Sequence, residues 1–196
     1  MTHRKAGPTT RGTLRQTGFF SVVRARRSVR KFSTRTVPKA VLATLIDAAR
    51  HAPSSMGGTS VRILVLRDKT IKQKVAAFKN AWCPPAKREY PADFLQEAPV
   101  LLVVCVTDRE SHGRWIENGV IASTYIMLAA TALGLATTFL TAYNLRRPKQ
   151  VRELKKLLQI PVHVTPVNIL PIGYPDEKPR PKKLRALRDI LHYDAF

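Results

Sequence analysis

Cysteine is scarce in this chain of 196 residues, and the two that it has, Cys83 and Cys105, fit neither a disulfide framework nor a metal-binding spacing. Its five histidines show no His-x-x-x-His spacing, so we expect no bound metal ion. Because few cysteines are typical of proteins from a reducing compartment, we expect this protein in the cytoplasm.

Several signatures of other protein classes are absent. No Gly-x-Gly-x-x-Gly follows a predicted strand, which argues against a Rossmann dinucleotide fold. Ser54 and Ser55 lack a nucleophile-elbow context, which argues against a hydrolase, and no apolar run precedes Phe19 that could form a secretory signal. Residues 119–143 carry no charge, but Gly134 and six Ser or Thr side chains interrupt them, so we interpret them as a buried helix and strand rather than a membrane span.

Acidic residues are also few, since 34 Lys and Arg stand against 13 Asp and Glu and give a formal net charge of +21. The positive excess is concentrated in two blocks far apart in the sequence, residues 1–50 and 145–188. Such a charge attracts polyanions, so a basic nucleic-acid-binding protein is one alternative, although the chain has no recognisable nucleic-acid motif. We expect residues 1–20 to form a flexible basic arm and residues 21–196 to form one domain.

The apolar pattern predicts mixed helices and strands without a strict βαβ period. The run at 99–106 does not alternate, so we expect a central strand that is covered on both faces. The longest predicted helix, 117–133, ends at Gly134, and a strand is expected at 136–142. Residues 81–98 are rich in proline and charge, and we expect a loop there that could gate a substrate. Further helices are predicted at 36–52, 70–80 and 151–158, and further strands at 61–66 and 162–171. An α+β sandwich accounts for this pattern.

Two basic motifs have the chemistry of a phosphate site. In the first, Arg26, Arg27 and Arg30 surround Ser28, and guanidinium groups beside a hydroxyl donor suit a terminal phosphate. In the second, prolines stiffen the backbone ahead of Lys183 and Arg185 and could direct both side chains at one anion. Taken singly, a basic motif of this kind is more often a solvated surface than a binding site.

A set of motifs in a fixed order gives the two basic blocks a common interpretation. The set comprises Arg26-Arg27-Ser28-Val29-Arg30, Ala52-Pro53-Ser54-Ser55, Ala132-Leu133-Gly134-Leu135, Leu170-Pro171-Ile172-Gly173-Tyr174-Pro175 and Lys183-Leu184-Arg185. In this order and spacing, from about Ser21 to the end of the chain, it resembles the nitroreductase family. The resemblance implies an α+β sandwich with a central, mostly antiparallel sheet flanked by helices, assembled as an intertwined homodimer with FMN at the interface.

The resemblance also implies a role for each motif. Arg26, Ser28, Lys183 and Arg185 would hold the FMN phosphate, and Arg30 would lie near the N1/O2 edge of the flavin ring. The remaining cofactor-binding positions that it implies are Arg27 in the first motif, Pro53, Ser54, Ser55 and Gly57 beside the ring, and the backbone of Leu140 and Thr141. No catalytic side chain is expected, because the flavin carries the chemistry.

By the same resemblance, the chain is an FMN-dependent oxidoreductase that passes electrons from NADH or NADPH to small electron-poor acceptors, such as nitroaromatics, quinones or activated alkenes, by a ping-pong mechanism. A specialised flavin reductase or dehalogenase of the same fold is the alternative within the family. Gly57 stands where the family usually has Asn, Ser60-Val61-Arg62 replaces its Gln-Pro-Trp, and its Asn-x-x-Lys has no counterpart near residues 91–94. These departures leave the substrate preference and the hydrogen bonding of the ring open.

Overall fold

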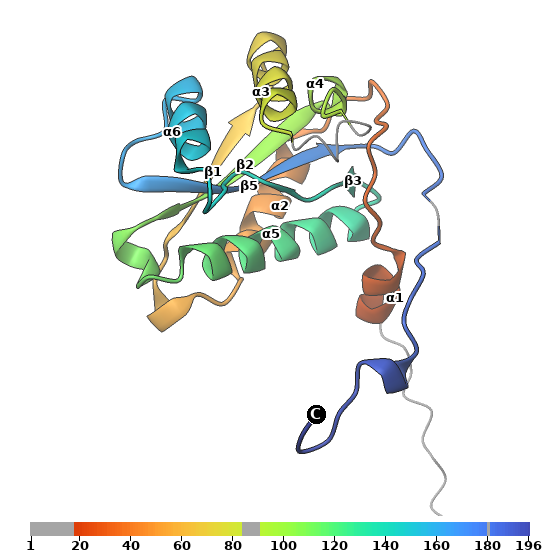
Figure 1. Cartoon of the computed structure of the whole chain (residues 1–196). Coiled ribbons are helices and arrows are strands. Elements are labelled where there is room, and N and C mark those ends of the chain that lie inside the picture. The colour runs from red at the N-terminus through yellow and green to blue at the C-terminus, as the bar shows by residue number, and fades with distance from the viewer. Residues whose placement is uncertain (1–17, 84–90, 180) are drawn as a thin grey trace, which may run out of the picture.

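A five-stranded sheet with helices on both faces forms the body of the molecule (Figure 1). The computed structural model describes residues 18–83, 91–179 and 181–196. The strands are β1 (Val61–Leu66), β2 (Val100–Thr107), β3 (Ala136–Thr137), β4 (Leu140–Thr141) and β5 (Val164–Gly173). Their order is β1-β2-β5-β3, with β4 also paired to β5, and each of these pairs is antiparallel. The predicted α+β sandwich with a mostly antiparallel sheet is confirmed.

Two hydrophobic cores lie on the two faces of the sheet. The helices are α1 (Gly18–Ala25), α2 (Lys39–Arg50), α3 (Lys69–Ala81), α4 (Phe94–Glu97), α5 (Trp115–Ala132) and α6 (Pro148–Leu157). Leu101 and Val103 of β2 pack with α3, α4 and α6, whereas Leu102 and Val104 pack with α2 and α5. Because β2 is buried on both faces, its sequence is continuously apolar, as the unbroken run predicted.

The long helix α5 carries no charged residue from Gly119 onward, and this stretch packs against the sheet. Gly119 lets the helix approach β5 closely, since a Cβ atom there would lie 2.6 Å from the side chain of Val167. The helix ends before Gly134, whose φ of +70° belongs to the left-handed region that favours glycine. Among the helices that the structure describes, none is long and apolar enough to cross a membrane.

The predicted strand at 136–142 is wrong in its continuity, because the structure has two short strands there. β3 and β4 both pair with β5, but Thr138 and Phe139 between them leave the ladder. By the register of both pairs, Thr138 lies opposite Pro171, which has no N–H to donate. The strand is therefore interrupted at the point where β5 can accept a backbone hydrogen bond but cannot donate one.

Two other segments refine the sequence expectations. Most of the predicted arm, residues 1–17, lies outside the described residues, but residues 18–20 begin the helix α1 and are not extended. The predicted loop at 81–98 contains the short helix α4, and its residues 84–90 lie outside the described part of the chain.

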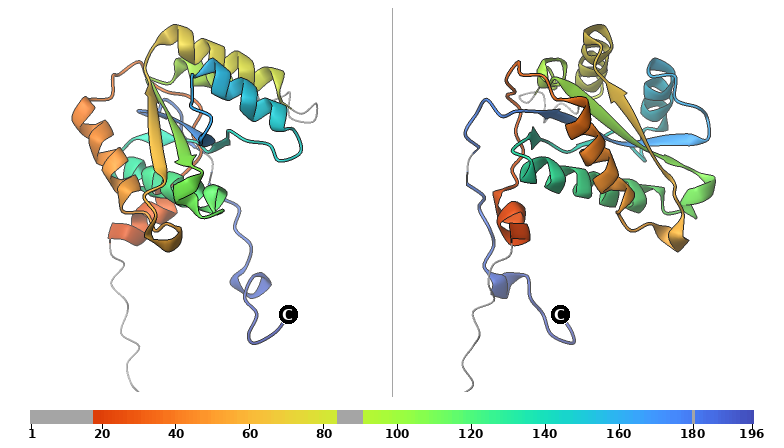
Figure 2. Two further views of the ribbon diagram at one scale, coloured as in Figure 1. Left: turned by 90° about the vertical axis from the view of Figure 1, so that its left-hand side faces the viewer. Right: turned by 180° about the vertical axis from the view of Figure 1, so that it is seen from behind.

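The C-terminal tail, residues 181–196, leaves the sandwich on the side of α5 and runs away from the sheet (Figures 1 and 2). All its side chains are exposed. Several are large and apolar: Leu184, Leu187, Ile190, Tyr193 and Phe196. Phe19 and Phe20 of α1 are exposed as well, although α1 packs against α5. A single chain therefore leaves much apolar surface uncovered at this end of the molecule.

Candidate functional site

Residues 26–31, which we call the arginine segment, follow α1 and are fixed against the edge of the sheet. Ser28 forms a parallel bridge with Thr137 of β3, and the N–H of Val29 donates to the carbonyl of Thr137 at 3.1 Å. Val29 is buried in the core and anchors the segment. The basic residues on either side of it are exposed or half-buried. Arg27 turns back along the chain and donates to the carbonyls of Arg24 and Arg26. The predicted phosphate motif therefore has a defined backbone.

Glu177, which follows β5, holds the other half of this segment. Its carboxylate accepts the backbone N–H groups of Arg30 at 2.6 Å and of Lys31 at 3.2 Å. The carbonyl of Lys31 in turn accepts the N–H of Asp176 at 3.0 Å. Sequence reasoning gave Glu177 no role, because nothing in the sequence places it beside residues almost 150 positions earlier.

The second basic block returns to the first. The pKa of Lys182 lies below its ordinary value, because partial desolvation and the positive charges of Arg26 and Arg27 disfavour its ammonium form. At Lys182, the second block thus lies within electrostatic range of Arg26 and Arg27. Lys183 and Arg185 follow on the same exposed tail.

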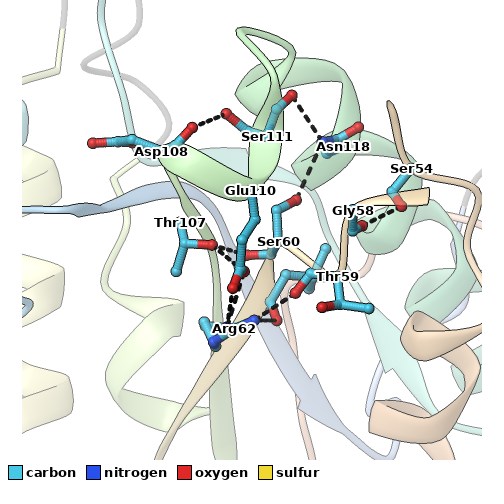
Figure 3. Close-up of polar contacts among 11 residues, drawn as sticks. Ser54, Gly58, Thr59, Ser60, Arg62, Thr107, Asp108, Glu110, Ser111 and Asn118 are labelled. Carbon is cyan, nitrogen blue, oxygen red and sulfur yellow. Dashed lines mark hydrogen bonds and ion pairs between the residues drawn. The ribbon is translucent and has the colours of Figure 1, made fainter. Parts of the chain in front are cut away.

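The Pro53–Gly58 loop is held by a buried asparagine at the start of α5, whose bond to Ser60, just after the loop, is drawn in Figure 3. Asn118 accepts the N–H of Ser55 at 3.0 Å and donates to the hydroxyl of Ser60 at 3.2 Å. Within the loop, the hydroxyl of Ser54 donates to the carbonyl of Gly58. A side chain at Gly58 would collide with the backbone carbonyl of Glu110, so the loop packs directly on the chain after β2. Pro53 lies exposed at the start of this loop.

The same loop has an unusual backbone. Met56 and Gly57 both have positive φ, 51° and 67°. Glycine and asparagine are the residues that adopt this conformation most readily. Gly57 in place of the family's Asn is therefore compatible with this backbone, and it lacks the amide side chain.

The arginine segment and the Pro53–Gly58 loop do not meet within one chain. The loop is fixed to the first turn of α5, whereas the arginine segment is fixed to β3, just beyond the other end of that helix (Figure 1). An 18-residue helix is about 27 Å long. The structure thus brings the two basic blocks together and leaves the predicted ring loop at the far end of the molecule.

A cavity of about 650 Å³ joins the arginine segment to β4. Arg30 lines it together with Leu140 and Thr141, three of the residues predicted to lie near a flavin ring. The guanidinium carbon of Arg30 lies 6.0 Å from the centre of the Phe94 ring, which also lines the cavity. From α3, the ammonium of Lys79 donates to the carbonyl of Thr141 at 2.8 Å.

Buried polar side chains of β5 and α5 fix the position of β4 on the side of the core. The amide of Asn168 on β5 donates to the carbonyl of Leu140 at 3.3 Å. The Oδ1 of Asn168 accepts the hydroxyl of Ser123 on α5 at 2.9 Å, and both residues are fully buried. The backbone that would face the ring is therefore held by two elements of the core.

Two further cavities lie away from the arginine segment. One of about 720 Å³ lies beside Arg62, Thr107 and Glu110 and contains none of the predicted site residues. The other, of about 540 Å³, includes Ser54 of the predicted ring loop. In the part of the chain that the structure describes, no cluster of His, Cys, Asp or Glu could hold a metal ion.

Comparison with known proteins identifies the family. The sequence profile of the nitroreductase family matches residues 23–174, most of the chain. The chain belongs to the nitroreductase family. A protein from Methanothermobacter thermautotrophicus, named provisionally as an NADH dehydrogenase/NAD(P)H nitroreductase, is similar to this chain. The two are 30% identical over 175 residues, which cover 88% of this chain and 85% of that protein. The predicted family is therefore confirmed.

Two other similar proteins carry more specific names. Iodotyrosine deiodinase from Thermotoga neapolitana is 29% identical to this nitroreductase over 192 residues, which cover 90% of this chain and 98% of that protein. A solved FMN-dependent nitroreductase from Clostridium difficile has a TM-score of 0.75 and 28% identity, and the match covers 90% of this chain and 99% of that one. The fold is thus that of flavin enzymes from this family.

Proposed function

We propose that this protein is a homodimeric oxidoreductase that passes electrons from NADH or NADPH through FMN to small electron-poor acceptors, such as nitroaromatics, quinones or activated alkenes, in a ping-pong cycle. As a member of the nitroreductase family it is an NAD(P)H-dependent flavin enzyme with FMN as cofactor. The observation that carries the proposal is the contact between the two basic blocks, in which Glu177 accepts the N–H of Arg30, beside the cavity lined by Arg30, Leu140 and Thr141.

FMN fits the residues present at both of its ends. The positive charges of Arg26 and Arg27 disfavour the charged form of Lys182, and a phosphate dianion between these side chains would offset that effect. We assign the phosphate to Arg26, Arg27 and Ser28 with Lys183 and Arg185 of the tail. When bound, FMN supplies two-electron transfer, since it takes a hydride from NAD(P)H and returns the electrons to an acceptor. Arg30 would stabilise negative charge at the ring, and the cavity would exclude water from it.

We propose a dimer because the arginine segment and the Pro53–Gly58 loop lie far apart within one chain. Pro53, Ser54, Ser55 and Gly57 lie too far from the arginine segment of their own chain to contact the same flavin, so we infer that they contact the flavin of a partner chain. The uncovered apolar side chains of α1 and the tail provide the surface for such an intertwined dimer. We also propose the cytoplasm as its compartment, which the two free cysteines favour.

A specialised dehalogenase is the second candidate function, favoured by the likeness to iodotyrosine deiodinase over nearly the whole chain. A panel of NAD(P)H-driven reactions separates the two. Release of iodide from 3-iodotyrosine, faster than reduction of a nitroaromatic or a quinone, would favour the dehalogenase.

The experiment for the main proposal is the absorbance spectrum of the purified protein, followed by anaerobic addition of NADH or NADPH. We expect a flavin spectrum that NAD(P)H bleaches and a nitroaromatic or quinone restores. Arg26→Ala combined with Arg185→Ala should lose the flavin, whereas Arg188→Ala, on the same tail, should retain it. Colourless protein that FMN does not reconstitute, but that binds duplex DNA at physiological salt, would replace this proposal with the nucleic-acid alternative.

A further inference from the structure

Lys79 is a cation in the cavity that the arginine segment shares with β4. Its half-buried side chain extends from the last turns of α3, and its ammonium donates to the carbonyl of Thr141 at 2.8 Å. Among the described residues, no Asp or Glu forms an ion pair with it, and burial lowers the pKa of its ammonium. A half-buried cation whose hydrogen bond goes to a neutral carbonyl is only partly compensated, and a negative charge in the cavity would improve its environment.

The geometry around Lys79 differs from that of Lys72, a buried lysine on the same helix. Lys72, two turns earlier, donates to the carbonyl of Ala98 at the end of α4, which serves the packing of α3 on α4. Lys79 instead lines a cavity together with Arg30 of the arginine segment. Two cations therefore border one cavity of about 650 Å³, which also has the aromatic and apolar lining that suits a planar ring.

We infer that Lys79 is a second cofactor-contacting cation, positioned by the carbonyl of Thr141, that stabilises the negative charge gained by FMN on reduction. Hydride transfer from NAD(P)H brings two electrons and one proton and leaves NAD(P)⁺, so the ring gains one negative charge. This inference rests on the proposed function.

The test is the two-electron midpoint potential of FMN bound to the full-length protein, measured by equilibration with a redox dye. Lys79→Gln removes the charge but retains a donor for the Thr141 carbonyl, and Lys79→Arg retains the charge. We expect Lys79→Gln to lower the preference for reduced over oxidised flavin about tenfold, which corresponds to a potential lower by about 30 mV. Lys79→Arg should stay close to the unmodified protein. Lys74→Gln, an exposed lysine on the same helix, controls for the change in net charge.

A potential in Lys79→Gln equal to that in Lys74→Gln would overturn the inference and leave the proposed function intact. If Lys79→Gln does not fold, Lys79→Met provides the same comparison. Wild-type protein that binds no FMN would instead refute the proposed function, and the inference with it. A merely structural role for Lys79 would lower the stability or the FMN affinity of both redox forms equally, without moving the potential.

Discussion

Replacing Asn118 with alanine should loosen the Pro53–Gly58 loop from α5, because this one side chain joins the loop to the helix. Asn118 is 2% exposed and forms two good hydrogen bonds, from the N–H of Ser55 and to the hydroxyl of Ser60. Its third contact, to the carbonyl of Ser111 at 3.5 Å, is too long to contribute much. Each good bond contributes about 1 kcal/mol, and a buried group left without a partner costs about 1–3 kcal/mol. We therefore expect the free energy of unfolding to fall by about 2–4 kcal/mol.

Urea unfolding of the flavin-free protein measures that loss, and titration with FMN measures its consequence for binding. If the loop contacts the flavin of the partner chain, FMN affinity should fall as well. Thr124→Ala is the matched control, since Thr124 is an exposed residue of the same helix whose hydroxyl only donates back to Val120. The reasoning fails if Asn118→Ala and Thr124→Ala unfold at the same urea concentration.

Three further predictions follow from single contacts. Gly119→Ala should lower the free energy of unfolding by about 1–3 kcal/mol in urea titrations, because its Cβ would collide with Val167. The hydrogen bond from Thr107 lowers the pKa of Glu110 in the folded state. The Glu110 carboxylate therefore stabilises the fold at pH values above its pKa in the unfolded state, and this stabilisation is lost as the pH falls through its pKa in the folded state. Glu110→Gln should flatten this acid part of a plot of unfolding free energy against pH. Burial raises the pKa of Cys105 to about 12, so its thiol should react with a disulfide reagent only after unfolding, as a time course with and without urea would show.

The elements that could be predicted from the sequence are those whose pattern depends on burial. The unbroken apolar run became β2 because both of its faces are covered, and the uncharged stretch became α5 because it is buried against the sheet. Gly134 was recognised as a helix end because its positive φ is a local requirement. The interruption between β3 and β4 was missed, because it depends on Pro171 in a strand that is distant in sequence.

The candidate site was predictable where a motif carried it and unpredictable where tertiary contacts did. The ordered motifs identified the arginine segment and the family. The roles of Glu177 and Lys79 come from contacts with residues 62 or more positions away, and no spacing in the sequence signals them. The exposed apolar side chains of the tail could be read as core residues from sequence alone, and the structure shows that one chain does not bury them.

The central claim, that Arg26 and Arg185 bind the phosphate of FMN, is tested most directly by comparing the affinity for FMN with that for riboflavin, which lacks the phosphate. Two charge-assisted hydrogen bonds contribute about 1.5–3 kcal/mol each, so removing both should reduce the preference for FMN over riboflavin by roughly two to four orders of magnitude. The double variant Arg26→Ala, Arg185→Ala should show this reduction, with little change in the affinity for riboflavin. An unchanged preference for FMN in the double variant would contradict the account.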